Sequence, residues 1–125
     1  MKDMTDLFFA DTYAFIELIK GSKAYQPYLT KQLITTKFNL AELYYYFLND
    51  YDEESADHYL SLFRKIVVPI TYESIRSAMK FKLIYKREKL SYVDCIGYAL
   101  SLQYGVRFLT GDQKFEHKEN VEFVK

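Results

Sequence analysis

The sequence has little that could cross-link the chain or hold it in a lipid bilayer. Cys95 is its only cysteine, which excludes an intrachain disulfide and suits a reducing compartment. No apolar run approaches the roughly 20 residues that cross a membrane. The opening residues 1–6 are too acidic for a signal peptide. We therefore expect a cytoplasmic protein that does not associate with membranes.

Net charge is also lacking, because 17 Lys and Arg residues balance 17 Asp and Glu residues. This balance argues against a protein that grips polyanions over its whole surface, but it leaves room for a local basic strip. Tryptophan is absent, and no linker, repeat or low-complexity segment interrupts the 125 residues. Half of the residues are hydrophobic and 13 are tyrosine. This composition predicts a single globular domain over residues 1–125 with a sizeable core.

Short apolar runs alternate with amphipathic segments along the chain. The runs predict strands at residues 7–10, 33–36, 66–70, 106–109 and 121–124. The segments between them predict helices at residues 12–19, 40–49, 58–65, 72–87 and 91–104. This alternation indicates an α/β fold, a three-layer α/β/α sandwich with a parallel sheet. In such folds ligands bind beyond the carboxyl ends of the strands.

Two aspartates are expected at that edge because each follows a strand. Asp11 comes directly after the first run, and either Asp11 or Thr12 could cap the helix that begins there. Asp112 follows the fourth run after a Thr-Gly break.

Two acids are expected in the first turns of helices, and one of them, Glu42, is also expected to follow the second strand directly. Glu42 lies three residues after Asn39, the expected cap of the second helix, and Asp94 lies three residues after Ser91. Taken singly, each of these acids could simply cap a helix or occupy a turn. We interpret the set as an acidic pocket because all of them are placed near strand ends.

Carboxylates brought together repel one another and need a compensating cation. Oxygen ligands without matched histidine or cysteine favour Mg²⁺ or Mn²⁺ over Zn²⁺. Such ions activate water and neutralise phosphate oxygens in phosphodiester hydrolysis. The expected reaction class is therefore metal-dependent phosphodiester cleavage.

Four short motifs, in this order and spacing, resemble the PIN-domain family and, within it, the VapC-type toxin ribonucleases. They are Phe9-Ala10-Asp11-Thr12, Asn39-Leu40-Ala41-Glu42-Leu43, Leu90-Ser91-Tyr92-Val93-Asp94 and Leu109-Thr110-Gly111-Asp112-Gln113-Lys114-Phe115. The resemblance implies a sheet with strand order 3-2-1-4-5. It also implies RNA cleavage with one or two Mg²⁺ or Mn²⁺ ions held by the four acids Asp11, Glu42, Asp94 and Asp112.

The same resemblance implies supporting residues and a protein partner. Thr110 and Ser91 match positions that support the acidic site through hydrogen bonds, and Asn39 stands where the family often has a small hydroxyl residue. The expected partner is an antitoxin, a segment of which would lie in an apolar groove near the acids.

A basic run leads into the helix that carries Asp94. It consists of Lys80, Lys82, Lys86, Arg87 and Lys89. Arg87 and Lys89, the members nearest the acid, are the candidates for contact with an RNA backbone, since phosphate contacts position a substrate without reading its sequence. The alternative for the whole run is an ordinary solvated helix face.

Residues 44–47, Tyr-Tyr-Tyr-Phe, are too aromatic for one buried helix stripe. One or two of them should be exposed, which suggests a homodimer or a partner surface.

Three functional hypotheses follow, and the leading one is the metal-dependent endoribonuclease. The second is a non-catalytic module that binds a protein through its aromatic surface. The third is a receiver-like domain with Asp11 as phosphoacceptor, which the available neighbours Asp6 and Lys114 fit poorly. Cys95 has no suitably placed histidine to make it a nucleophile, so we expect it to be a buried small hydrophobic residue.

Overall fold

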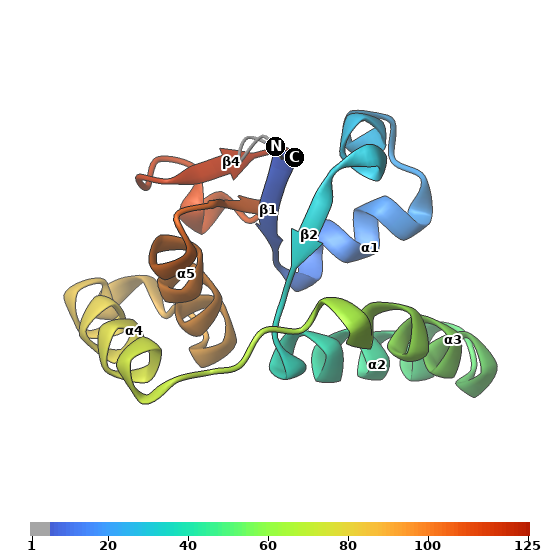
Figure 1. Cartoon of the computed structure of the whole chain (residues 1–125), viewed down its shortest axis with the longest axis horizontal. Helices are drawn as coiled ribbons and strands as arrows, with labels where there is room; N and C mark the ends of the chain where they lie inside the picture. Colours follow the sequence, from blue (N-terminus) through green and yellow to red (C-terminus); the bar gives the residue numbers. More distant parts are fainter. Residues whose placement is uncertain (1–5) are drawn as a thin grey trace.

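The computed structural model describes residues 6–125, so residues 1–5 of the acidic opening segment lie outside the described residues. The sheet is parallel and has four strands in the order β2-β1-β3-β4, as Figure 1 shows in part. The strands are β1 (Leu7–Ala10), β2 (Gln32–Ile34), β3 (Arg107–Thr110) and β4 (Val121–Phe123). Phe9 of β1 is aligned with Phe108 of β3, and this register brings the carboxyl ends of the two central strands to the same edge.

The expected third strand is much shorter than predicted. Within residues 66–70 only Val67 pairs, in an isolated parallel bridge with Thr35 beside β2. A 3-10 turn, η3 (Arg64–Ile66), occupies the residues before it. Pro69 has no N–H with which to extend the ladder. The bridge still lies on the outer side of β2, so the expected order 3-2-1-4-5 holds, with the third strand reduced to one residue pair.

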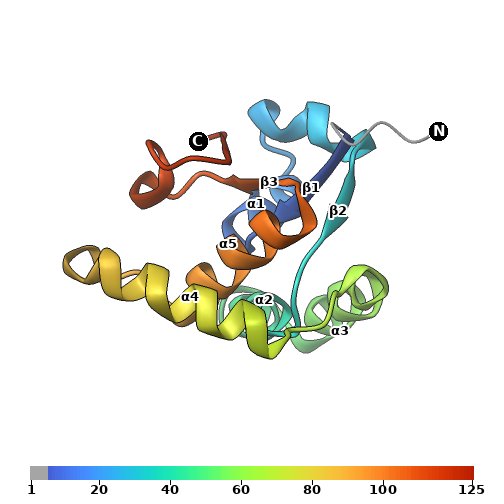
Figure 2. The ribbon, with the colours of Figure 1, turned by 60° about the vertical axis from the view of Figure 1, so that its left-hand side comes forward.

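Helices cover both faces of the sheet (Figures 1 and 2), which confirms the three-layer α/β architecture. On one face, α5 lies on the central strands and α4 packs against α5. On the other face, α1 lies on β1 and β3, and α2 packs against both α1 and α3. The helices are α1 (Thr12–Lys20), α2 (Lys37–Asp50), α3 (Glu53–Phe63), α4 (Tyr72–Ile84) and α5 (Tyr92–Tyr104), with 3-10 segments η2 (Lys23–Thr30), η4 (Lys86–Glu88) and η5 (Gln113–Phe115).

Two hydrophobic clusters lie on the two faces of the sheet because side chains alternate along each strand. Phe9 and Phe108 point toward α5 and stack on each other, with ring centroids 5.8 Å apart. Their neighbours Phe8 and Leu109 point the other way, into the cluster that includes Phe15 of α1. Both strands are therefore packed on two faces, and Asp11 directly follows β1 while Thr110 ends β3.

Gly97 allows α5 to approach the sheet closely. A Cβ atom at this position would lie 2.7 Å from Cε1 of Phe9 and 3.3 Å from Cε1 of Phe108. Both rings are fully buried and have little room to move. We expect Gly97→Ala to lower the free energy of unfolding by about 1–3 kcal/mol, the usual cost of overpacking. Urea denaturation would measure this, and a variant at least as stable as the parent would contradict it.

Candidate active site

Asp11 is the most buried acid of the site, with 3 % of its surface exposed. It follows β1 and is the N-cap of α1, where its Oδ1 accepts a hydrogen bond from the Ala14 amide at 2.9 Å. Its Oδ2 accepts a hydrogen bond from the Thr110 hydroxyl at 2.5 Å. Burial raises the pKa of Asp11 to about 7, despite the opposing effect of these two hydrogen bonds, and the charges of Asp94 and Asp112 raise it further.

Asp94 lies in the first turn of α5, and Ser91 is the N-cap of that helix, as expected. The Ser91 hydroxyl oxygen accepts a hydrogen bond from the Asp94 amide at 3.0 Å. Burial raises the pKa of Asp94 to about 6, and the charges of Asp112 and Glu42 raise it too. A hydrogen bond with Ser91 and the positive charge of Lys114 act in the opposite direction. Asp94 therefore lies within electrostatic reach of both Asp112 and Glu42.

Thr110 links two of these acids at the end of β3. Its hydroxyl donates to Asp11 and accepts a hydrogen bond from the Asp112 amide at 3.0 Å. The Asp112 carboxylate turns back on its own loop, where Oδ1 accepts from the Lys114 amide at 3.0 Å. Thr110 therefore holds the Asp11 carboxylate and the start of the Asp112 loop in a single arrangement.

The expected cap of the second helix was wrong. Thr36, with extended backbone at the end of β2, is the N-cap of α2, and its hydroxyl oxygen accepts from the Asn39 amide at 3.2 Å. A hydroxyl residue three positions before Asn39 allows the helix to begin almost directly after the strand. Glu42 consequently lies in the second turn rather than the first, and it does not directly follow a strand.

Asn39 and Glu42 nevertheless reach the edge that carries Asp11. The Asn39 side-chain amide donates to the Thr12 hydroxyl oxygen at 3.2 Å, and the Thr12 hydroxyl donates to Glu42 Oε1 at 2.5 Å. The sequence marked Thr12 only as an alternative cap, whereas the fold uses it to join α1 to α2. The position of Thr12 next to Asp11 is the one feature of the sequence that could have indicated this role.

Across residues 6–125, no group of three or more acidic, histidine or cysteine side chains is arranged so that it could hold a metal ion. Glu42 and Asp112 instead point to their own donors, the Thr12 hydroxyl and the Lys114 amide. The donor chemistry still fits Mg²⁺ or Mn²⁺, because the four acids offer only carboxylate oxygens. Their mutual repulsion is the kind that a divalent cation relieves.

The basic run divides into two kinds of residue. Lys82 donates to the Leu90 carbonyl oxygen and its ammonium lies 4.7 Å from the centre of the Tyr92 ring, so it has a structural role. Arg87 and Lys89 are exposed, in η4 and just after it. Lys89 has a left-handed backbone, with φ of 56°.

Cys95 and the aromatic segment behave as expected. Cys95 is fully buried, and burial raises the pKa of its thiol to about 11, which makes a nucleophilic role unfavourable. In the segment 44–47, Tyr45 is 70 % exposed, whereas Phe47 lies in the core.

The family described as "PIN domain" matches residues 8–121. The chain belongs to the PIN-domain family. No curated protein sequence matches it. This PIN-domain chain has, within the part that the structure describes, no helix both long and apolar enough to span a bilayer.

Three solved structures share its fold. VapC20 of Mycobacterium tuberculosis, described as a sarcin–ricin loop cleaving toxin, matches with a TM-score of 0.78 and 17 % identity, over 94 % of this chain and 99 % of that one. VapBC2 of Rickettsia felis, bound to a DNA fragment from its promoter, matches with a TM-score of 0.73 and 15 % identity, over 95 % and 99 %. A toxin–antitoxin complex from Klebsiella pneumoniae matches with a TM-score of 0.71 and 18 % identity, over 91 % and 94 %.

Proposed function

We propose that this PIN-domain chain is a Mg²⁺- or Mn²⁺-dependent endoribonuclease and the toxin of a VapBC-type toxin–antitoxin pair. The observation that carries the proposal is the gathering of acids at one edge of the sheet: Thr110 bonds to both the Asp11 carboxylate and the Asp112 amide, Thr12 beside Asp11 bonds to Glu42, and the charges of Asp112 and Glu42 raise the pKa of Asp94. Asp11 is buried, Asp94 and Asp112 are partly buried, and Glu42 is exposed. Holding like charges close together at a partly buried site is costly, so this arrangement favours a function that uses them together with a cation. The PIN-domain family match and the VapC-like fold support the same reading.

In this proposal the four acids Asp11, Glu42, Asp94 and Asp112 hold the divalent cation. When bound, the cation supplies positive charge that acidifies water and neutralises phosphate oxygens. Hydroxyl groups orient the acids: Thr110 bonds to Asp11, Thr12 to Glu42, and Ser91 to the first turn of α5. No separate side-chain general base is assigned.

The RNA backbone would approach across Arg87 and Lys89, which are exposed beside the start of α5. Phosphate contacts of this kind position a substrate. Single-stranded or looped RNA is the expected substrate, because bases there are accessible and the backbone can bend into a narrow site.

An antitoxin is the proposed protein partner. Two of the similar structures are toxin–antitoxin complexes. An apolar groove of about 810 Å³ between α2 and α3 is lined in part by Leu40 and Ala41, which directly precede Glu42 in the chain, and could receive an antitoxin segment. The exposed Tyr45 supports a homodimer or partner surface, and the single buried Cys95 suits a reducing cytoplasm.

The direct test is cleavage of structured RNAs by the purified protein. We expect cuts in loops in the presence of Mn²⁺ or Mg²⁺, and none in EDTA, with activity restored when excess Mn²⁺ is added back. A gel or sequencing readout would map the cuts. Absence of cleavage under every metal condition would reject the nuclease and favour the non-catalytic binding module, whose partner binding would be insensitive to EDTA.

A further inference from the structure

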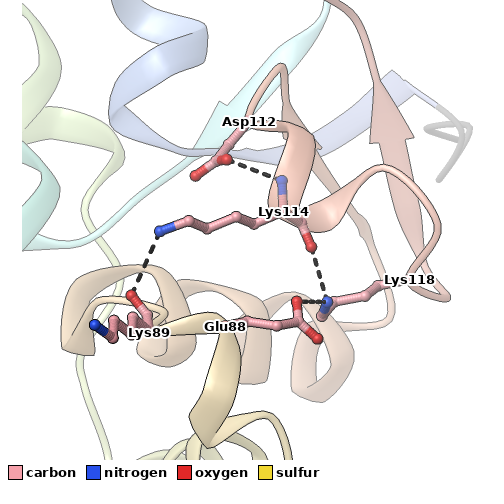
Figure 3. A network of polar contacts seen from close by, with 5 residues as sticks. All are labelled: Glu88, Lys89, Asp112, Lys114 and Lys118. Carbon is pink, nitrogen blue, oxygen red and sulfur yellow. Dashed lines mark hydrogen bonds and ion pairs between the residues drawn. The ribbon is translucent and has the colours of Figure 1, made fainter.

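An ion pair beside the acids ties together the two segments that flank them. Lys118 follows Asp112 and η5, and Glu88 ends η4, three residues before the Ser91 cap of α5. The Lys118 ammonium nitrogen lies 2.6 Å from Glu88 Oε1. Figure 3 shows this contact beside Asp112 and Lys114.

The Lys118 side chain is held on several sides, unlike a typical surface lysine. Only 11 % of it is exposed, and its ammonium also donates to the Lys114 carbonyl oxygen at 2.8 Å. The ammonium lies 4.4 Å from the centre of the Tyr85 ring and 5.6 Å from that of Phe115. A cation enclosed by a carboxylate, a carbonyl and two aromatic faces has one preferred position.

Lys114 connects this ammonium to the candidate site. Its backbone is held at both ends: the carbonyl accepts from Lys118, and the amide donates to the Asp112 carboxylate at 3.0 Å. Its own ammonium reaches the Lys89 carbonyl oxygen at 3.5 Å (Figure 3). In residues 6–125, this contact and the Lys118–Glu88 pair are the polar bonds that join segment 85–90 to segment 112–118.

We propose that Lys118, anchored by Glu88, is a positioning residue that sets the Asp112 loop against the start of α5. Through the Lys114 backbone it fixes the direction of the Asp112 carboxylate and the place of the Lys114 ammonium beside the acids. This inference rests on the proposed nuclease function. It concerns how the site is held together rather than which groups form it.

Lys118→Ala is the primary test, and Arg107→Ala is the matched control. Arg107 also forms an ion pair, at 2.7 Å with Glu122, and its side chain also donates to a backbone carbonyl, but it lies at the opposite end of β3 from the acids. Lys118→Ala should cost more stability than Arg107→Ala, because the Lys118 side chain is 11 % exposed and that of Arg107 is 56 % exposed. Only Lys118→Ala should weaken Mn²⁺ binding and lower kcat, each by about 10-fold as for outer-shell residues of metal sites, with KM changed by less than about twofold.

A charge swap separates positioning from simple stabilisation. In Glu88→Lys combined with Lys118→Glu the ion pair can re-form, but residue 118 can no longer donate to the Lys114 carbonyl. We expect the swap to recover only part of the thermal stability lost in Lys118→Ala, because a carboxylate at position 118 keeps neither the carbonyl bond nor the contacts with the Tyr85 and Phe115 rings, and to recover no Mn²⁺ affinity. Full recovery of both would show that the pair only stabilises the fold, and would overturn the inference.

Mn²⁺ affinity, measured by electron paramagnetic resonance or calorimetry, gives a readout independent of RNA cleavage. If the parent protein binds Mn²⁺ and cleaves RNA, but Lys118→Ala behaves like Arg107→Ala, the inference fails and the proposed function stands. If the parent protein does neither, both fail. Should Lys118→Ala not fold, the milder Glu88→Gln replaces it, and unchanged Mn²⁺ affinity in that variant also overturns the inference.

Discussion

Asp94→Asn is expected to abolish RNA cleavage while leaving the protein folded. Asparagine has the size of aspartate and keeps a hydrogen-bonding side chain beside Ser91, so the start of α5 should be retained. The substitution removes one negative charge from a site where Asp112 and Glu42 already oppose the charge of Asp94. We expect kcat/KM to fall by at least about 10³-fold, or about 4 kcal/mol of transition-state stabilisation, with a melting temperature equal to or above that of the parent.

Glu116→Gln is the matched control for this experiment. Glu116 is another carboxylate of the same region, four residues after Asp112, and its side chain is 44 % exposed, close to His117. Removing its charge should leave cleavage unchanged. If Asp94→Asn cleaves RNA as fast as Glu116→Gln, Asp94 is not part of the active site.

The second large effect is on stability, and it depends on pH. The pKa of Asp11 is raised from 3.8 to about 7 in the folded protein, mainly by burial. Between these two values the folded state binds a proton that the unfolded state does not bind, so stability falls as pH rises through this window and levels off above it. Asp11→Asn removes this loss, so its advantage over the parent should grow from near zero at pH 4 to at most about 4 kcal/mol at pH 8, at 1.36 kcal/mol per pKa unit.

Urea denaturation in metal-free buffer at several pH values would measure this difference. Asp52→Asn is the control, because Asp52 is also an N-cap, at α3, but is exposed. A hydrogen bond from the Ser55 backbone lowers the pKa of Asp52, so its contribution is lost only in more acid solution and stays flat between pH 5 and 8. A pH-independent difference between Asp11→Asn and the parent would show that burial does not disfavour the Asp11 charge.

Mn²⁺ adds a further comparison to the same measurement. A ligand that binds only the folded state stabilises it in proportion to the logarithm of its concentration. Mn²⁺ should therefore stabilise the parent more than Asp11→Asn, which lacks one ligand of the proposed set. Equal stabilisation of the two would argue against Asp11 as a metal ligand.

Much of the fold could be predicted because it depends on local pattern. The apolar run at β1 and the Ser91 cap of α5 each depend on residues within one or two turns of each other. The alternation of strands and helices was enough for the parallel three-layer sheet. Positions of Asp11 and Asp112 follow from the ends of β1 and β3, since parallel strands end at a common edge.

Other features depended on competition or on distant partners. Two residues near the start of α2 could cap it, and Thr36 is chosen because the backbone is still extended there as it leaves β2. The predicted third strand forms only one bridge, because the η3 turn occupies the residues before Val67 and Pro69 has no N–H to continue the hydrogen bonds with β2. Hydrophobic periodicity predicts neither the cap of α2 nor the length of the third strand, because both depend on which backbone N–H and C=O groups form hydrogen bonds in the folded protein.

What the sequence by itself determined is the set of elements, the places of Asp11 and Asp112 beyond the ends of strands, and the place of Asp94 in the first turn of a helix, because hydrophobic periodicity and capping act over a few residues. Only the tertiary structure decided how those carboxylates are held. The Thr12 hydroxyl donates a hydrogen bond to Glu42, and the Thr110 hydroxyl donates one to Asp11. The ion pair of Lys118 with Glu88 holds the Asp112 loop. These partners lie 30, 99 and 30 residues apart in the chain. Hydrogen bonds and ion pairs over such separations exist only once the sheet has brought the segments together.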